Sequence, residues 1–176
     1  MTFSKRGQKT AEDLFEKCKE ISPLYYDGDM PREAWIRDKF SYHIPFLFVG
    51  ATGIAVRLIA PFVEDKLQDS AVIVMDQRGR HVIPLLSGHM GGANEIARNL
   101  ADRVGAEVIL TTATDVEDLF AVDVFARRNG FCICDRAGIR RISQRLLEGE
   151  KIRLAIDPAI TFFKEDLPEG LHLVEA

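Results

Sequence analysis

Several features that mark well-known protein classes are missing from this sequence. It contains no apolar run long enough to span a bilayer and no cationic leader before an apolar segment, so we expect a cytoplasmic protein with no membrane partner. Basic residues are not in excess either, because the formal net charge is −4 and the isoelectric point lies near 5.6. Nucleic acid is therefore not an expected partner.

Cysteine is scarce, and its spacing fits no common metal site. The three cysteines are Cys18, Cys132 and Cys134, and no C-x-x-C pair occurs among them. The four histidines are scattered along the chain, so we expect no metal site. An odd number of cysteines, two of them in a strand-like run, predicts buried thiols in a reducing compartment rather than disulfides.

Three familiar glycine motifs are also absent. No glycine cluster ends in Gly-Lys-Ser/Thr, none follows the order G-x-G-x-x-G, and no serine occupies the centre of G-x-S-x-G. The first two absences argue against a general nucleotide-binding α/β domain. The third argues against a serine hydrolase of the nucleophile-elbow type.

What the sequence does contain is a regular alternation of strand-like and helix-like segments. Short apolar runs predict buried strands over residues 46–49, 71–75 and 108–110, a hairpin turn over 76–80 with a return strand over 81–84, and further strands over 131–134 and 152–156. Apolar residues at three- and four-residue spacing predict helices over 8–19, 32–40, 54–63 with a break at Pro61, 96–104, 118–129 and 139–149.

This alternation predicts an α/β fold of βαβ units, with a mainly parallel sheet covered by helices on both faces. We place an N-terminal α/β domain at residues 1–115 and a second, smaller α/β segment at 116–176. Loops rich in small residues follow three of the strands, at 50–53, 84–95 and 111–115. Because ligands bind beyond the carboxyl ends of the strands in such sheets, we expect these loops to form one site together.

The second of these loops has the sequence Ser87-Gly88-His89-Met90-Gly91-Gly92 and opens a helix. Its glycines allow a close approach of the backbone to a ligand, and the helix N-terminus favours an anion. His89 is a candidate general base, since the unperturbed pKa of histidine is about 6.5. The alternative is a tight turn that needs glycine for packing alone.

The remaining candidates lie on the neighbouring turns. Gly50, Thr52, Gly53 and Arg57 form either a second anion cradle or a plain strand-to-helix turn, and Asp115, with Thr112 and Thr114, is either a catalytic group or a helix cap. Arg78, Arg80 and His81 form either a polyanion contact or a solvated turn. The candidate catalytic residues are thus His89 and Asp115, and the candidate substrate-binding residues are Gly50, Thr52, Gly53, Arg57, Arg78, Arg80, Ser87, Gly88, Gly91, Gly92, Asn94, Thr112 and Thr114.

Three stretches of the sequence, 48–57, 83–95 and 111–115, resemble the CbiG family of cobalamin-biosynthesis proteins, the cobalt-precorrin-5A hydrolases. The resemblance covers residues 46–123 best, and the segment to about residue 156 looks like the middle region of the family. Family members usually open with a full apolar strand, where this sequence has only Thr2 and Phe3. They also usually continue into a C-terminal domain, which we expect to be absent from this chain.

The resemblance implies hydrolysis of the δ-lactone of cobalt-precorrin-5A, with release of acetaldehyde and formation of cobalt-precorrin-5B. Cobalt belongs to this corrinoid substrate, so no separate cofactor is expected. Our hypothesis for the chemistry takes His89 as the base, the N–H groups around Gly91 and Gly92 as the oxyanion site, and Asp115 as the group that orients His89. The alternative is a non-catalytic module that holds the corrinoid for a partner enzyme or a separate C-terminal domain, and a homo-oligomer also remains open.

Overall fold

The computed structural model describes residues 1–163 and 167, together with the backbone of 172–175. The chain forms two compact units, Met1–Leu110 and Thr111–Ala176. The boundary between these units falls a few residues before the predicted division at 115. Among the described residues, none of the helices is both long enough and apolar enough to cross a membrane.

The first unit is built on a four-stranded sheet with the order β1-β2-β3-β4. Its strands are β1 (Phe46–Val49), β2 (Val72–Met75), β3 (His81–Leu86) and β4 (Glu107–Val108). β1 pairs with β2 and β3 with β4 in parallel, whereas β2 and β3 form the antiparallel hairpin that the sequence predicts. The fold is thus two βαβ units joined by a hairpin, which confirms a mainly parallel α/β fold.

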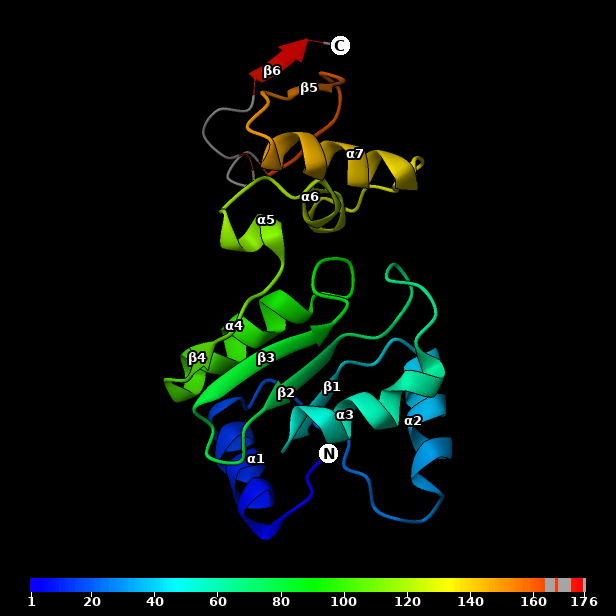
Figure 1. Cartoon of the computed structure of the whole chain (residues 1–176), viewed down its shortest axis with the longest axis vertical. Coiled ribbons are helices and arrows are strands. Elements are labelled where there is room, and N and C mark those ends of the chain that lie inside the picture. The colour runs from blue at the N-terminus through cyan, green and yellow to red at the C-terminus, as the bar shows by residue number, and fades with distance from the viewer. Residues whose placement is uncertain (164–166, 168–171, 176) are drawn as a thin grey trace. The chain divides into compact units, whose positions relative to one another are not determined.

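Helices cover both faces of this sheet (Figure 1). α1 (Lys5–Lys17) and α4 (Ala93–Val104) pack on one face, and α2 (Arg32–Ser41) and α3 (Thr52–Ile59) pack on the other. Alternate side chains of each strand supply the two cores, so that Phe48 lies under α2 and α3 while Val49 faces α1 and α4. Phe48 is fully buried, and burial of a side chain of that size contributes about 2 kcal/mol or more.

Two helix ends in this unit lie at proline residues. α3 ends at Ile59, and a 3-10 helix, η1 (Ala60–Phe62), carries Pro61. Pro31 is the N-cap of α2, directly before the first residue of that helix. A strand does occur near the predicted 108–110, but the predicted bounds and burial are wrong, because β4 is a two-residue edge strand in which Glu107 is exposed and Val108 is half-buried.

The direction of β3 decides where the small-residue loops lie. β1 and β2 both run toward the 50–53 loop and the 76–80 turn, and the Gly50 N–H donates to the Met75 carbonyl at that end, 2.9 Å away. β3 runs back from the turn, so the 87–92 loop follows its other end. The prediction that the 50–53 and 87–92 loops share one edge is wrong, because the hairpin reverses the chain between them.

The second unit contains α5 (Ala113–Val116), α6 (Val122–Arg128), α7 (Arg136–Leu147) and a parallel pair of strands, β5 (Arg153–Ile156) and β6 (His172–Glu175). The Phe125 ring is central, because it contacts the rings of Phe120, Phe131 and Phe162. α6 starts at Val122 and not near Asp118, whose backbone is left-handed with φ +50°.

Two predictions for the cysteine-containing segment of this unit are wrong. Residues 131–134 do not form a strand: Phe131 and Ile133 are half-buried, while Cys132 and Cys134 are exposed. The alternation matches a strand, but no partner strand lies beside it among the described residues. Of the three thiols only Cys18 is buried, and burial raises its pKa.

Candidate functional site

The 87–92 loop closes on itself before α4 begins. Ser87 turns the chain at φ +55°, and its carbonyl then accepts the Ala93 N–H at 3.1 Å. The Gly88 carbonyl accepts the Asn94 N–H at 3.0 Å, and the His89 carbonyl accepts the Gly92 N–H at the same distance. These bonds occupy the N–H of the N-cap and of the first two residues of α4, which would otherwise be open to an anion.

Two glycines of this loop are sterically required. A Cβ atom on Gly91 would lie 2.5 Å from the Ser87 Cβ and 2.8 Å from the Ser87 carbonyl oxygen. A Cβ on Gly88 would lie 2.5 Å from the Asn94 Oδ1. Packing alone therefore accounts for Gly88 and Gly91, and any chemistry of the loop depends on its polar groups.

Those polar groups are gathered at one end of β3. Ser87 and Asn94 are buried, and His89 is half-buried. The Ser87 Oγ makes no hydrogen bond to any described residue. The Gly92 N–H already donates to His89, so of the two expected oxyanion donors only the Gly91 N–H has no bond within the described part of the chain.

The predicted residues of the 50–53 loop lie at the other edge of the sheet. The ring of Phe3 covers Gly50, where a Cβ would lie 2.9 Å from the Phe3 Cδ2. Thr52 is the first residue of α3, and the Arg57 guanidinium donates to the Gly53 carbonyl at 3.0 Å. Arg57 is thus engaged within its own helix, as in the plain-turn alternative, and remains exposed.

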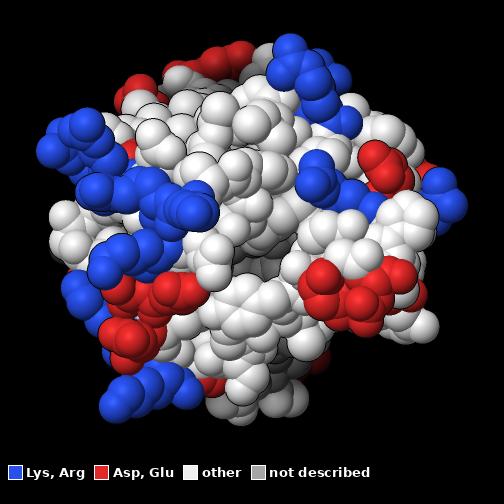
Figure 2. All heavy atoms as spheres, turned by 90° about the horizontal axis from the view of Figure 1, so that it is seen from below, with Lys and Arg blue, Asp and Glu red and all other residues white. Residues whose placement is uncertain are grey.

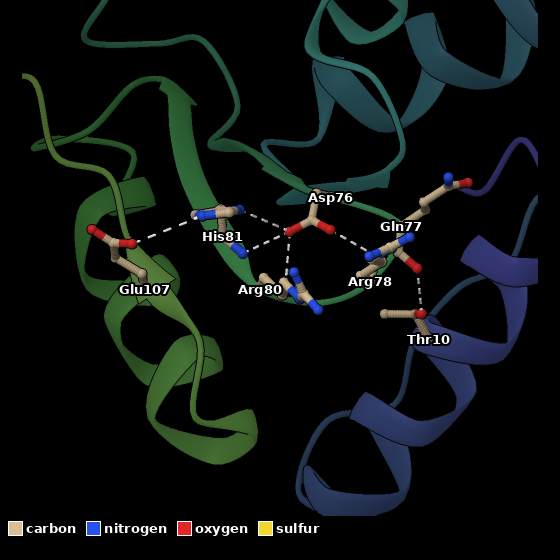
Figure 3. Close-up of polar contacts among 7 residues, drawn as sticks. All are labelled: Thr10, Asp76, Gln77, Arg78, Arg80, His81 and Glu107. Carbon is tan, nitrogen blue, oxygen red and sulfur yellow. Dashed lines mark hydrogen bonds and ion pairs between the residues drawn. The ribbon is translucent and has the colours of Figure 1, made fainter.

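The 76–80 turn is organised by a carboxylate that sequence reasoning did not single out (Figure 3). Asp76 accepts the backbone N–H groups of Arg78, Arg80 and His81 at 2.7–2.8 Å, and the His81 Nδ1 lies 3.2 Å away. An aspartate at the end of a strand, three residues before a glycine, is the sequence signal for such a turn.

These contacts also set the ionisation of Asp76. Partial burial alone would raise the pKa of its carboxyl, but the donors from Arg78, His81 and Arg80 outweigh it and hold the pKa below the usual value. Asp76 therefore stays charged, and its oxygens are engaged by the turn. The side chains of Arg78 and Arg80 make no ion pair with any described residue.

The third predicted loop belongs to the second unit. Thr112 is the N-cap of α5, Thr114 is buried, and Asp115 lies in the first turn of that helix. Thr112, not Asp115, therefore occupies the capping position. His89 and Asp115 lie in different units, and their pairing remains a prediction. No group of three or more His, Cys, Asp or Glu in the described ranges could hold a metal ion.

The structure thus divides the candidate residues into separate groups. It gathers Ser87, Gly88, His89, Gly91, Gly92 and Asn94 in one loop. At the other end of the strands lie Gly50, Thr52, Gly53, Arg57, Arg78 and Arg80. Besides Asp76, sequence reasoning missed the basic residues of α1 beside the turn, which show in the sequence only as positive charges at helical spacing.

Two family models match most of the chain. The model described as cobalamin synthesis G N-terminal matches residues 34–115, which include the 50–53, 87–92 and 111–115 stretches. The model described as cobalamin biosynthesis central region matches residues 120–169.

Curated relatives and a solved structure agree with these matches. A protein of Salmonella typhimurium named cobalt-precorrin-5A hydrolase is 42% identical over 147 residues, which are 83% of this chain and 41% of that protein. A protein of Priestia megaterium with the same name is 37% identical over 64% of this chain and 30% of its own length. The chain thus spans less than half the length of these relatives.

The fold is shared with a crystal structure of a cobalamin biosynthesis protein G homolog from Sulfolobus solfataricus. That structure superposes with a TM-score of 0.60 and 26% identity, covering 97% of this chain and 50% of the other. Sequence models for both regions, named relatives and fold all agree. The chain therefore belongs to the CbiG family of cobalamin-biosynthesis proteins.

Proposed function

We propose that this chain acts in the hydrolysis of cobalt-precorrin-5A in the anaerobic route to cobalamin. The observation that carries the proposal is the 42% identity to a relative named for that reaction, over a span that includes the 87–92 loop. The proposed product is cobalt-precorrin-5B, and the proposed leaving fragment is acetaldehyde.

The chemistry sets clear demands on the site. Water adds to the lactone carbonyl, and the tetrahedral oxyanion collapses to a carboxylate and an alcohol. Loss of the alcohol proton then breaks the adjacent carbon–carbon bond: the carbon that carries oxygen leaves as acetaldehyde, and the electron pair passes to the macrocycle, which takes up a proton. A site for both steps needs a base and a donor to the oxyanion.

The 87–92 loop contains one candidate for the base and one for the donor to the oxyanion. His89 would take the proton from water and from the alcohol, because its ring is partly accessible in a loop whose other polar groups are buried. The Gly91 N–H would donate to the oxyanion, since the N–H groups of the three residues that follow it are already occupied. The Ser87 hydroxyl and the Asn94 amide would contact the substrate, and Asp115 would orient His89.

Cobalt enters this scheme as part of the substrate, and we expect no other cofactor. The peripheral carboxylates of the corrinoid would meet the positive end of the α4 dipole beyond the loop. The expected partners are other cobalamin-pathway enzymes or a separate C-terminal domain, and the expected compartment is the cytoplasm, which follows from the sequence pattern alone.

The direct test is to incubate the purified chain with cobalt-precorrin-5A and to measure the corrinoid mass and acetaldehyde over time. Turnover supports the proposal. Ligand-dependent stabilisation without turnover supports instead the second candidate, a corrinoid-binding module; the observation that favours it is that packing alone accounts for Gly88 and Gly91 of the loop. If neither occurs, both candidates are wrong for this chain.

The assignment of His89 is tested by His89→Ala. We expect a loss of activity of roughly 10²–10⁴-fold, the usual contribution of a general base, with corrinoid binding largely unchanged. His81→Ala is the matched control, because His81 begins β3 at the opposite end from the loop. Equal activity of the two variants would remove His89 from the mechanism.

A further inference from the structure

A groove lies between α1 and the 76–80 turn, at the edge of the sheet away from the 87–92 loop. Its volume is about 300 Å³. The fully buried Leu14 and Met75 and the half-buried Val104 lie at its base. The remaining lining is polar or charged, from Arg6, Lys9, Thr10, Asp13, Lys17, Arg78 and Gly79.

Positive charge dominates this lining. Arg6, Lys9, Lys17 and Arg78 contribute four cations against the single carboxylate of Asp13. None of the four forms an ion pair with a described residue, whereas Arg103 nearby pairs with Glu20 at 2.8 Å. Figure 2 views the molecule from below and shows groups of Lys and Arg side chains on this surface beside groups of Asp and Glu. A groove in which cations outnumber carboxylates in this way attracts an anion.

The walls of the groove are fixed to each other. The Thr10 hydroxyl of α1 donates to the Gln77 carbonyl of the turn at 2.8 Å (Figure 3). The Ser4 hydroxyl contacts the Gln77 Oε1 at 3.3 Å. The Asp76 carboxylate fixes the backbone of the turn by accepting the N–H groups of Arg78 and Arg80. The oxygens of this nearby carboxylate are engaged by the turn, and the Thr10 and Ser4 contacts hold the two walls together without a ligand.

Size and position separate this groove from the loop that carries His89. The six residues of β3 span roughly 20 Å, at about 3.3 Å per residue, between the turn and the loop. The groove also lies at the lower limit of small-molecule sites, about 300 Å³, which is too small for a corrin macrocycle. Its chemistry therefore suits a compact anion with several charged groups.

We propose that the groove between α1 and the 76–80 turn is a binding site for a small polyanion, which its cations hold by carboxylate or phosphate groups. Arg78 offers a planar fork for two oxygens of one group, and Lys9 offers a point charge to another. The site is separate from the 87–92 loop, and its occupancy does not depend on lactone hydrolysis.

Isothermal titration calorimetry of the full chain at low ionic strength tests the proposal, with citrate as the carboxylate probe and tripolyphosphate as the phosphate probe. Saturable binding of either probe is expected, and the tighter of the two identifies the preferred group. Affinity should fall as salt is added, because exposed charges are screened. The charge reversal Lys9→Glu with Arg78→Glu should weaken binding by about tenfold or more.

Lys5→Glu is the matched control, since Lys5 is exposed on the same helix but does not line the groove. Lys9→Gln with Arg78→Gln provides a milder second variant, and unchanged Trp35 fluorescence shows that each variant is folded. Wild-type affinity in Lys5→Glu and in His89→Ala supports a localised site. No binding of either probe, equal binding by the Lys9 and Arg78 variants, or equal weakening by Lys5→Glu would overturn it.

Discussion

The two ends of β3 carry loops that the sequence marks in similar ways but that are built by opposite means. The 87–92 loop is held by backbone hydrogen bonds and by contacts too close for a side chain on Gly88 or Gly91. The 76–80 turn is held by one carboxylate, and the side chains of its arginines make no ion pair with any described residue. Packing therefore explains much of the glycine-rich loop, whereas the charge of the basic turn is not explained by its own contacts.

In the 87–92 loop, packing explains Gly88 and Gly91, because their neighbours leave no room for a Cβ. Packing does not explain the buried Ser87 hydroxyl, which makes no hydrogen bond to a described residue, since burial of an unsatisfied polar group costs free energy. In the exposed 76–80 turn, the feature that calls for a function is the positive charge of the two arginine side chains.

The largest effect on stability is expected from Gly91→Ala. The added methyl group would overlap the Ser87 Cβ and the backbone carbonyl oxygen of Ser87, neither of which can move without shifting the backbone of the loop, so we expect a loss of about 3 kcal/mol in the free energy of unfolding. Urea unfolding followed by the fluorescence of Trp35, the single tryptophan, measures this loss in the first unit, where that ring packs on Phe46.

Gly53→Ala is the control from the other edge of the sheet. Gly53 is helical, and its nearest neighbour is the end of the Arg57 side chain at 3.1 Å, which can move. Alanine is the better helix former, so the change should be neutral or stabilising by up to about 1 kcal/mol. Equal losses at the two glycines would show that the loops do not differ in packing.

A smaller effect is expected from Asp76→Asn, which removes the charge that holds the turn. Near pH 7 we expect a loss of about 1–2 kcal/mol, because charge-assisted bonds to three N–H groups become weaker. The pKa of Asp76 is lowered, so its contribution is complete above the ordinary carboxyl pKa of about 3.9 and disappears as the pH falls through the lowered value.

Urea titrations from neutral pH to about pH 3 measure this difference between wild type and Asp76→Asn, which should shrink only below the ordinary carboxyl range, about pH 4. Asp13→Asn is the control, since it removes an equal charge that makes no hydrogen bond to a described residue. A difference that stays constant at low pH would mean that Asp76 acts through packing.

Local patterns predicted the elements better than their arrangement. The apolar runs at 46–49 and 71–75 and the break at Pro61 follow from spacing and from the geometry of proline, and all three are observed. The edge of the sheet to which each loop belongs depends on strand direction, and the sequence of the 76–80 hairpin predicts the reversal without showing its consequence. The alternation at 131–134 misled because a strand needs a partner.

The candidate site was predictable only in part, for a similar reason. The 87–92 loop stands out by composition, whereas the occupancy of the Gly92 N–H is a property of how the loop folds. Asp76 went unnoticed as an organiser because a single aspartate in a turn is common. The α1 side of the basic groove is spread over one helix, and only its packing beside the turn brings Lys9 close to Arg78.

The smallest expected effect on stability, Ser87→Ala, gives the finest test of the buried loop. The change removes a buried hydroxyl without a partner and keeps the backbone, so the free energy of unfolding should stay equal or rise by about 1 kcal/mol. If that hydroxyl contacts the corrinoid, KM should rise at the same time by roughly tenfold, the value of one hydrogen bond.

Ser70→Ala is the control, because the Ser70 hydroxyl is buried and donates to the Phe40 carbonyl at 3.1 Å, so its removal should cost stability without a change in KM. A stabilised Ser87→Ala with unchanged kinetics would leave His89 and the Gly91 N–H as the functional groups of the loop. A destabilised one would mean that Ser87, like Gly88 and Gly91, serves packing.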